Sequence, residues 1–313
     1  MIPDEPAPLL GVVVVNYGSH ALLEQNLAAL DLAAVPARAV VVDNFHSAAE
    51  RAAVGGLAAR EGWELVAPPG NGGFGSGSNL GATAALALGC TAVLLLNPDV
   101  EIDEGTAAAL LAATAARPAA MISPTIVRRD GTAWFSGGLV HRRTGDVTAT
   151  AGPDLDPRWG WLTAACLAAH RDAWTRAGGF DDRYFMYWED VDLSRRVLGA
   201  GGELVVRPDL RVVHDVGGTQ VGGAGAGPTA KSELYYFTNC RNRLLYAAAH
   251  LSRRDRLRWL LATPRSSWRI LLRGGRRQLL RSPGPLRAAV TGTAAGVLAL
   301  LRGPAAPRPA GRP

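Results

Sequence analysis

The sequence contains few cysteines, and it lacks a hydrophobic leader at its N-terminus. Three cysteines occur in 313 residues, and the wide spacing of Cys90, Cys166 and Cys240 fits neither a zinc site nor a disulfide framework. Residues 1–5 combine a proline with acidic side chains, where a secretory signal would have a basic region followed by an apolar core. These absences predict a protein of the reducing cytosol.

No stretch is long and apolar enough to be predicted as a membrane span. The longest uncharged run near the C-terminus, residues 288–301, is interrupted by Thr291, Gly292, Thr293 and Gly296. A spanning helix needs about 20 predominantly apolar residues, so this run is too short. We therefore predict no transmembrane segment.

Lysine is almost absent, and the basic residues are concentrated toward the C-terminus. Residues 1–250 contain 19 Lys and Arg against 26 Asp and Glu, whereas residues 251–313 contain 14 Arg against Asp255 alone. A protein that is basic throughout would suggest a nucleic acid partner. A basic extension on an acidic body instead predicts attraction to an anionic surface such as the cytoplasmic leaflet, and no nucleic acid partner is expected.

The basic extension also has an amphipathic pattern. Leu257, Leu261 and Trp268 recur near helical spacing among its arginines, and Pro264 is expected to kink the helix. Such a helix lies in a membrane interface, or it packs against the body of the protein or against another subunit. The sequence leaves these alternatives open.

The first 120 residues alternate between apolar runs and segments with helical spacing. Strands are predicted over residues 10–15, 39–42, 63–66 and 92–96, and helices over residues 19–30, 47–60, 78–88 and 103–116. Valine- and leucine-rich runs without alternation are typical of strands that are buried on both faces of a parallel sheet. The predicted fold class is therefore α/β, with a doubly wound and mostly parallel sheet.

After Pro118 the regular alternation is lost. Short polar segments with glycine-containing turns predict hairpins, and strands are predicted over residues 203–206 and 210–213. A long helix is expected over residues 231–250, before the basic extension. The chain is thus expected to add a smaller mixed region and C-terminal helices to the sheet.

Polar residues follow the predicted strands, at the sheet edge where α/β proteins bind ligands. Asp43, after the second strand, could accept hydrogen bonds from a nucleotide base or ribose, or it could begin a helix turn. The loop of residues 68–79 lets the backbone approach a ligand closely, and it opens a helix. Its match of Gly70, Gly72 and Gly75 to a dinucleotide-binding pattern is weak, because the loop follows the third strand rather than the first.

Asp99 ends the sequence Asn97-Pro98-Asp99 after the fourth strand. An aspartate in this position commonly serves a turn or caps a helix. Here it lies at the ligand-binding edge beside the glycine-rich loop, which favours a hard oxygen ligand for Mg²⁺ or Mn²⁺ on a diphosphate. His214 also ends a predicted strand, and it precedes a glycine-rich stretch, residues 217–227, that is predicted to be a mobile flap.

The stretch from Phe185 to Arg196 carries aromatic residues followed by Glu189, Asp190 and Asp192. Acidic residues in the first turn of a helix complement the helix dipole, which is one interpretation. Carboxylates beside aromatic rings are also where a base can be shielded from water near a sugar ring. The residues of this stretch leave both interpretations open.

Taken together, these features resemble a known family. The segments that carry the resemblance are Val15-Asn16-Tyr17, Val42-Asp43-Asn44, Asn71-Gly72-Gly73-Phe74-Gly75 with Asn79, Asn97-Pro98-Asp99, Gly178-Gly179-Phe180-Asp181, Tyr187-Trp188-Glu189-Asp190-Val191-Asp192-Leu193 and His214. In order and spacing, the chain from Val12 to about Leu245 is similar to the family 2 inverting glycosyltransferases with the GT-A fold. Residues 160–167 and 180–187 look most like actinobacterial rhamnosyltransferases, which implies dTDP-rhamnose as the donor.

The resemblance implies a role for each residue. Asp43 would recognise the nucleotide base, Asp99 and His214 would bind Mg²⁺ or Mn²⁺, and Asp190 would be the general base. The residues expected to bind the nucleotide sugar are Asn16, Tyr17, Asp43, Asn44, Asn71, Gly72, Phe74, Gly75, Asn79 and Asn97, and those expected to contact the acceptor are Glu189, Trp188, Tyr187 and Trp161. Asn97 stands where the usual Asp-x-Asp motif of the fold has its first carboxylate, so weaker metal binding is expected.

The implied organisation has three regions. Residues 1–120 would bind the nucleotide sugar, residues 121–227 would bind the acceptor and carry the base, and residues 228–313 would form an arginine-rich helical extension. The implied activity is transfer of a sugar from a dTDP- or UDP-linked donor to a hydroxyl of a lipid-linked or cell-surface glycan. The enzyme would be cytoplasmic and peripheral on the inner face of the plasma membrane. A small-molecule acceptor, a nucleotidyltransferase and a non-catalytic nucleotide-sugar-binding module are the alternatives.

Overall fold

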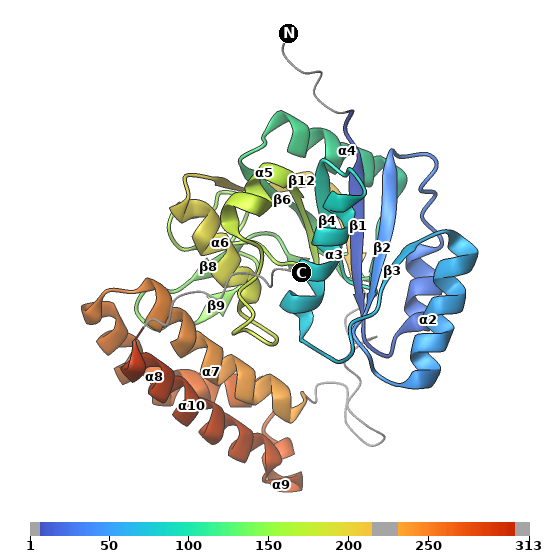
Figure 1. The fold of residues 1–313 in the computed structure, drawn as a ribbon. Helices are drawn as coiled ribbons and strands as arrows, with labels where there is room; N and C mark the ends of the chain where they lie inside the picture. Colours follow the sequence, from blue (N-terminus) through green and yellow to red (C-terminus); the bar gives the residue numbers. More distant parts are fainter. Residues whose placement is uncertain (1–6, 215–230, 304–313) are drawn as a thin grey trace.

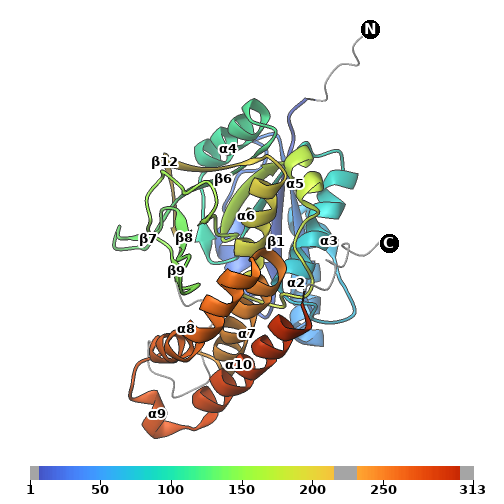
Figure 2. The same cartoon turned by 90° about the vertical axis from the view of Figure 1, so that its left-hand side faces the viewer.

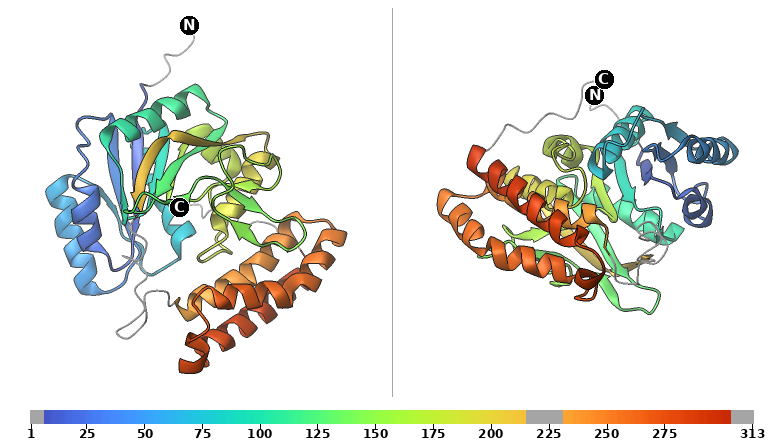
Figure 3. Two further views of the ribbon diagram at one scale, coloured as in Figure 1. Left: turned by 180° about the vertical axis from the view of Figure 1, so that it is seen from behind. Right: turned by 90° about the horizontal axis from the view of Figure 1, so that it is seen from below.

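The structure, a computed structural model, describes residues 7–214 and 231–303 (Figure 1). A central sheet with helices on both of its faces forms the body of the molecule, and the C-terminal helices form a separate layer at one side (Figures 2 and 3). The α/β fold class predicted from the sequence is confirmed.

Within the described residues, the main sheet has nine strands in the order β3-β2-β1-β4-β11-β6-β12-β5, with β7 beside β6. Their bounds are β1 Leu10–Asn16, β2 Ala37–Asp43, β3 Glu64–Val66, β4 Ala92–Leu96, β5 Val100–Glu101, β6 Ala120–Val127, β7 Ala133–Phe135, β11 Cys166–His170 and β12 Glu203–His214. Strands β1 to β4 pair in parallel, and so do β6 and β12. Strand β11 is antiparallel to both of its neighbours, β4 and β6, so the two halves of the chain share one sheet.

The helices on the sheet differ in how they begin, and some of them have a polar cap. They are α1 His20–Leu22, the π-helix η1 Leu23–Leu27, α2 Ala48–Glu61, α3 Phe74–Ala87, α4 Glu104–Ala116, α5 Arg171–Ala177 and α6 Glu189–Gly199. The side chain of Ser47 accepts a hydrogen bond from the Glu50 N–H at the start of α2, and Asp103 does the same for Thr106 at the start of α4. The helix predicted over residues 19–30 is wrong in extent, because only one short turn and a π-turn form there.

Helix α3 begins at Phe74, four residues before the predicted start at Ser78, so part of the glycine-rich loop is helical. A Cβ atom on Gly81 would lie 2.4 Å from Val13 Cγ1, and one on Gly77 would lie 2.9 Å from Val15 Cγ1. These glycines therefore let α3 lie directly on β1, which is a packing role rather than a contact with a ligand.

The second half adds a small antiparallel sheet of β8 Gly138–Val140, β9 Val147–Thr148 and β10 Gly160–Trp161. The two strands predicted at 203–206 and 210–213 are one strand, β12, with an irregularity between Arg207 and Arg211. The glycine-rich stretch of residues 217–227, predicted to be a flap, lies outside the described residues.

The C-terminal layer consists of α7 Glu233–His250, α8 Arg253–Leu272, α9 Gln278–Arg281 and α10 Gly284–Arg302. Pro264 lies inside α8, which continues on both sides of it. Gly292 lets helices α7 and α10 approach closely. A Cβ atom there would lie only 2.3 Å from the Phe237 carbonyl oxygen. Figure 2 shows α7, α8 and α10 side by side below the sheet.

Helix α10 is longer than the uncharged run from which we predicted no membrane span. By length and composition alone, its 19 residues are apolar enough to cross a bilayer, and about a third of it (33%) is buried within the protein. Core helices of soluble proteins have the same length and composition, and α10 packs along α7 here.

Candidate active site

Asn16 and Asp43 end neighbouring parallel strands and lie opposite each other in the register of β1 and β2. The Asn16 amide is buried, its nitrogen donates to Glu50 Oε1 at 3.0 Å, and its oxygen accepts from the Ser19 N–H at 3.0 Å. Both ends of this amide are therefore engaged within the protein. In the structure Asn16 fixes the turn after β1, and its predicted contact with the nucleotide sugar stays a prediction.

Asp43 is fully buried and forms an ion pair with Arg51 of α2, with 2.6 Å between Oδ2 and Nε. Its other oxygen, Oδ1, is buried without a hydrogen-bond partner among the described residues. A buried acceptor without a partner is costly, and an N–H or O–H group of a ligand would satisfy it. The ion pair between Arg51 and Asp43 was not predicted from the sequence. The only signal for it is that Arg51 lies eight residues after Asp43 in the chain.

Aromatic side chains surround this strand edge and remain open to solvent. Tyr17 is 50% exposed and meets the ring of His46 edge-on, with 5.0 Å between the ring centroids. Phe45 is 37% exposed, has a positive φ of 46°, and lies 4.5 Å below the Arg51 guanidinium. Among the residues predicted to lie near the nucleotide base, Tyr17 is therefore the one whose side chain is free to stack on a ligand.

The glycine-rich loop is held by two asparagine side chains. The Asn44 amide donates to Asn71 Oδ1 and to the Gly73 carbonyl, both at 3.0 Å, and Asn71 Oδ1 accepts from the Gly73 N–H at 2.8 Å. Gly73 has a φ of 90°, and a Cβ atom there would lie 2.1 Å from the Phe185 carbonyl oxygen. The Phe74 N–H donates to the same carbonyl at 3.0 Å, so the loop lies directly against the stretch that leads to Asp190.

Gly75 and Asn79 also have structural surroundings. A Cβ atom on Gly75 would lie 3.0 Å from Phe180 Cβ. The Asn79 amide exchanges two hydrogen bonds with the Phe180 backbone, at 2.9 Å and 2.8 Å. These two residues fasten α3 to the turn at 178–181, and their predicted contact with the nucleotide sugar stays a prediction. Gly72 is exposed and Phe74 is half-buried, so both remain able to contact a ligand.

Asp99 and His214 lie together, as a shared metal site requires. Strand β12 pairs with β5 so that His214 lies opposite Val100, and His214 Nε2 is 3.0 Å from Asp99 Oδ1. Both side chains are buried, and the Trp134 ring meets the imidazole edge-on at 4.3 Å. Among residues 7–214 and 231–303, no group of three or more His, Cys, Asp or Glu side chains is arranged to hold a metal ion.

The pair of Asp99 and His214 fits a divalent ion that is shared with a diphosphate. A carboxylate oxygen and an imidazole nitrogen are both metal ligands, and in this structure they are close enough to bind one ion. With two protein ligands, diphosphate oxygens and water would complete the coordination. Asn97 is half-buried beside them, and its N–H donates to the Ala165 carbonyl at 2.9 Å.

Asp190 lies in the first turn of α6 and is held by backbone and side-chain donors. Its Oδ1 accepts from the Val191 N–H at 2.8 Å, and the Ala164 N–H and the Thr163 hydroxyl lie close enough to lower its pKa. The neighbouring Ala165 carbonyl accepts from Asn97. The segment at 163–165 therefore joins the Asp190 carboxylate to the turn that carries Asp99.

The three carboxylates of this stretch differ in their pKa values. Burial raises the pKa of Asp190 to about 6, and burial together with the charge of Asp190 raises the pKa of Glu189 well above its ordinary value. Burial alone would also raise the pKa of Asp192, but hydrogen bonds and charge from His250 and Arg196 lower it below the ordinary value. Asp192 thus stays ionised as a structural anchor, and Asp190 is the half-buried carboxylate suited to accept a proton.

The backbone before Asp190 is strained. Tyr187 and Trp188 both have positive φ angles, 66° and 76°, which non-glycine residues rarely adopt. The side chain of Asn242 in α7 donates to the carbonyls of Met186 at 3.0 Å and Tyr187 at 2.8 Å, and it is fully buried. Asn242 therefore holds the turn that aims Asp190, and the sequence patterns gave no sign of it.

Two of the predicted acceptor residues lie in the core. Trp188 is 5% exposed and packs on Tyr246 and Trp259 of the C-terminal helices. Trp161 is 8% exposed and packs over Gly138. Their large rings fill space between layers, so the structure does not place them at an open acceptor surface. Tyr187 is half-buried against Tyr235, and Glu189 is buried with Oε2 unpaired among the described residues.

Known proteins resemble this chain in sequence over part of its length. No protein-family model matches it. It is 37% identical over 141 residues to the N-acetylglucosaminyl-diphospho-decaprenol L-rhamnosyltransferase of Mycobacterium tuberculosis, an alignment that covers 39% of this chain and 46% of the relative. It is 25% identical over 197 residues to the low-salt glycan biosynthesis hexosyltransferase Agl10 of Haloferax volcanii, covering 60% of this chain and 61% of the relative. The chain thus spans about half to three-fifths (46% and 61%) of these relatives.

Solved structures share the fold at low sequence identity. GalNAc-T7 with UDP, GalNAc and Mn²⁺ superposes with a TM-score of 0.58 at 15% identity, covering 76% of this chain and 48% of that one. The mannosyltransferase PcManGT from Pyrobaculum calidifontis, with GDP-Man and Mn²⁺, superposes with a TM-score of 0.54 at 15% identity, covering 95% and 91%. The fold is that of the GT-A glycosyltransferases.

The chain is thus similar in fold to GT-A glycosyltransferases, and over part of its length it is similar in sequence to an L-rhamnosyltransferase and a hexosyltransferase.

Proposed function

We propose that this protein is an inverting glycosyltransferase that moves a sugar from a nucleoside diphosphate to an acceptor hydroxyl. The observation that carries the proposal is Asp190, a half-buried carboxylate with its pKa raised to about 6, linked through residues 163–165 to the turn of Asp99 and His214. A base and a site for the leaving diphosphate at one sheet edge are what a direct displacement requires.

The chemistry is a single displacement at the anomeric carbon. The acceptor oxygen forms a bond to that carbon while its proton passes to an Asp190 oxygen, and the bond from the carbon to the diphosphate oxygen breaks. Because the acceptor enters opposite the leaving group, the configuration inverts. With its pKa at about 6, Asp190 is ionised at neutral pH and is a stronger base than an exposed aspartate at about 3.9.

Donor binding falls to the strand edge of β1 and β2. The unpaired Asp43 oxygen would accept from the base or ribose, and Tyr17 would cover the base. Asp99 and His214 would hold Mg²⁺ or Mn²⁺, which when bound neutralises charge on the departing diphosphate. The two similar structures named above were solved with Mn²⁺, which supports this choice of cofactor.

For the sugar and the acceptor, the mycobacterial relative supports L-rhamnose and a lipid-linked precursor. We infer dTDP-rhamnose as the donor and a hydroxyl of a lipid-linked or cell-surface glycan as the acceptor. Other nucleotide sugars and a small-molecule acceptor use the same site chemistry, and thermal shifts with a panel of dTDP-, UDP- and GDP-sugars would rank the donors.

We also propose a place at the cytoplasmic face of the membrane, and exposed residues of the C-terminal layer support this proposal. Leu257, Leu261 and Trp268 lie exposed on α8, at 56%, 74% and 51%, and arginines flank them. The opposite side of the same helix is buried through Trp259 and Leu271, so the apolar stripe predicted from the sequence is divided between body and solvent. An exposed apolar and cationic face suits the headgroup region of an anionic membrane.

The proposal is tested by incubating the protein with dTDP-rhamnose, Mn²⁺ and an N-acetylglucosaminyl-diphospho-lipid acceptor. We expect transfer with inversion, and we expect Asp190→Asn to lower kcat by about 10²- to 10⁴-fold. Thermal stabilisation by nucleotide would show that the variant still binds the donor. Unimpaired turnover by Asp190→Asn would overturn the assignment of the base.

A further inference from the structure

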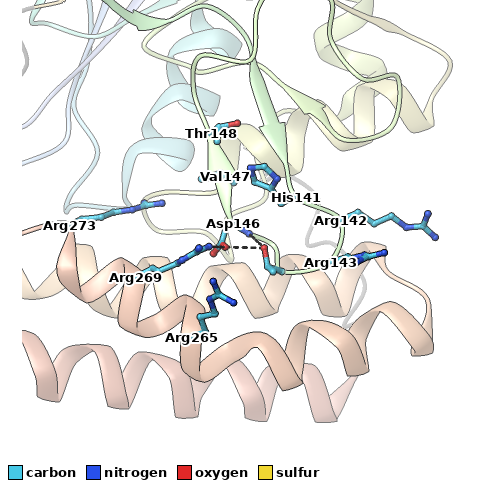
Figure 4. A pocket seen from close by; sticks show the side chains of 10 residues that line it. His141, Arg142, Arg143, Asp146, Val147, Thr148, Arg265, Arg269 and Arg273 are labelled. Atoms are coloured by element: carbon cyan, nitrogen blue, oxygen red, sulfur yellow. Dashed lines mark hydrogen bonds and ion pairs between the residues drawn. The ribbon is translucent and has the colours of Figure 1, made fainter.

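A cavity of about 630 Å³ lies between the β8–β9 hairpin and helix α8 (Figure 4). It is lined by His141, Arg142, Arg143, Thr144, Asp146, Val147, Thr148, Arg265, Arg269 and Arg273, which we call the arginine pocket. The hairpin supplies two of its arginines, helix α8 supplies two, and Arg273 directly follows the helix. The motifs that define the catalytic site contribute none of these residues.

The charges of the arginine pocket are poorly balanced. Asp146 is its one carboxylate, and this side chain is already engaged by Arg269 at 2.7 Å and by the Thr144 hydroxyl at 3.0 Å. Among the described residues, no carboxylate lies within ion-pair distance of Arg143 or Arg265, and both are exposed toward solvent. Guanidinium groups gathered around one cavity repel each other unless an anion lies between them.

The geometry of the pocket is fixed by buried contacts. The guanidinium of Arg243, which is itself buried, donates to the Thr144 carbonyl at 2.9 Å. The Trp259 indole donates to the Arg142 carbonyl at 2.9 Å. Gly145 has a φ of 68°, and a Cβ atom there would lie 2.6 Å from the Trp259 ring. The hairpin tip is therefore locked onto α7 and α8, and a preorganised set of donors binds an anion at a lower entropy cost.

The pocket connects to the acceptor side of the catalytic site. At its inner end, the Arg273 guanidinium donates to the Tyr235 hydroxyl at 3.1 Å. The Tyr235 ring meets Tyr187 edge-on at 5.1 Å, and Tyr187 lies three residues before Asp190. Two aromatic contacts thus run from an arginine of the pocket to the turn that precedes Asp190.

Apolar side chains lie beside the cationic ones on the outer surface of α8. Leu261 and Trp268 lie four residues before and three residues after Arg265, so helical spacing places all three on one face. Both apolar side chains are more than half exposed, at 74% and 51%. Cationic groups next to an apolar strip match an amphiphile with a phosphate head and a hydrocarbon tail.

We propose that the arginine pocket binds the phosphate groups of a lipid diphosphate, and that the hydrocarbon chain of this ligand runs along Leu261 and Trp268. The inference rests on the proposed function, because it makes the pocket the place where the lipid-linked acceptor is anchored while its sugar reaches Asp190. It assigns to the C-terminal layer the recognition of acceptor phosphate, separate from the donor diphosphate at Asp99 and His214.

The test measures binding of farnesyl diphosphate by isothermal titration calorimetry in EDTA, which removes divalent metal from the donor site. The double variant Arg143→Gln with Arg265→Gln removes two positive charges that make no ion pair among the described residues. The matched control, Arg253→Gln with Arg254→Gln, removes two exposed charges at the start of the same helix, outside the pocket. We expect at least about a tenfold rise in Kd for the pocket variant and less than a twofold change for the control.

The probe arms identify the source of the phosphate. Binding of farnesyl diphosphate but not farnesol, with weaker binding of inorganic pyrophosphate, supports a lipid diphosphate. Equal loss of affinity in both double variants, or unchanged affinity in the pocket variant, overturns the proposal. Pocket-dependent binding of phosphatidylglycerol vesicles at the expense of farnesyl diphosphate also overturns it, in favour of a membrane headgroup.

Failure of the proposed function would look different. If no nucleotide sugar is turned over, the calorimetry still decides whether the pocket binds lipid diphosphate. If transfer occurs, the pocket variant should raise the KM for the lipid acceptor by at least about tenfold while kcat and the KM for the donor stay within about twofold.

Discussion

Replacing Asp190 by asparagine should abolish activity and at the same time stabilise the fold near neutral pH. Burial raises the pKa of this carboxylate from 3.8 to about 6 in the folded protein. At about 1.4 kcal/mol per pKa unit, this shift corresponds to at most about 3 kcal/mol of unfavourable interaction with the ionised form. Asparagine has no charge to bury, and its oxygen can still accept from the Val191 N–H, so the variant avoids this cost.

The sign of the pH dependence follows from proton binding. Between about pH 4 and pH 6 the folded protein holds the Asp190 proton and the unfolded chain has released it, so the free energy of unfolding falls as the pH rises through this window. Asp190→Asn lacks this dependence. The variant should therefore exceed the wild type by up to about 3 kcal/mol at pH 7.5, and the difference should shrink toward pH 4.

Urea unfolding followed by tryptophan fluorescence at several pH values between 4.5 and 7.5 measures this difference. The exposed Asp154 offers the matched control, because Asp154→Asn makes the same chemical change away from the site and should give no pH-dependent difference. Wild-type kcat/KM should also fall about tenfold per pH unit below pH 6. A stability difference that is the same at every pH, with a flat rate profile down to pH 4.5, would refute a raised pKa for Asp190.

Two further substitutions test how the site is held together. Asn242→Ala removes both hydrogen bonds to the strained turn at Tyr187 and Trp188. We expect it to lower the free energy of unfolding by about 1–3 kcal/mol, measured by urea unfolding, and kcat by at least about tenfold, measured from initial rates. Full activity would show that the turn keeps its conformation without Asn242. His214→Ala removes one of the two predicted metal ligands, so the Mn²⁺ concentration at half-maximal activity should rise by at least about tenfold, whereas an unchanged metal requirement would contradict this assignment.

Much of the strand edge could be predicted from the sequence, because short-range patterns determine it. Asp43 directly follows one apolar run and Asp99 lies three residues after another, and the rule that parallel strands present their carboxyl ends to one edge brings them to the same side. The pairing of His214 with Asp99 was expected only from the family resemblance. In the structure this contact depends on the pairing of β12 with β5, two strands that are more than 100 residues apart in the chain.

Several of the predicted site residues make tertiary contacts that the sequence does not reveal. Asn16, Asn79 and Trp188 are polar or aromatic residues in the right motifs, but their partners come from distant segments that no local pattern reveals. Asn79 bonds to the backbone of Phe180, about a hundred positions away, and Trp188 packs on Trp259 from another layer. A motif thus identifies which residues cluster, but tertiary contacts decide which of them face a ligand.

Helix α7 gives the C-terminal layer a further consequence. Three successive residues of this helix reach different parts of the body: Arg241 bonds to the Arg183 carbonyl, Asn242 to the strained turn, and Arg243 to the hairpin tip. Helix α10 in turn rests on the α7 backbone through its glycines. Asp190 and the arginine pocket are thus both positioned by helix α7. Mutations in α7 that change acceptor specificity will therefore also shift Asp190, so acceptor specificity and the position of the base are expected to evolve together.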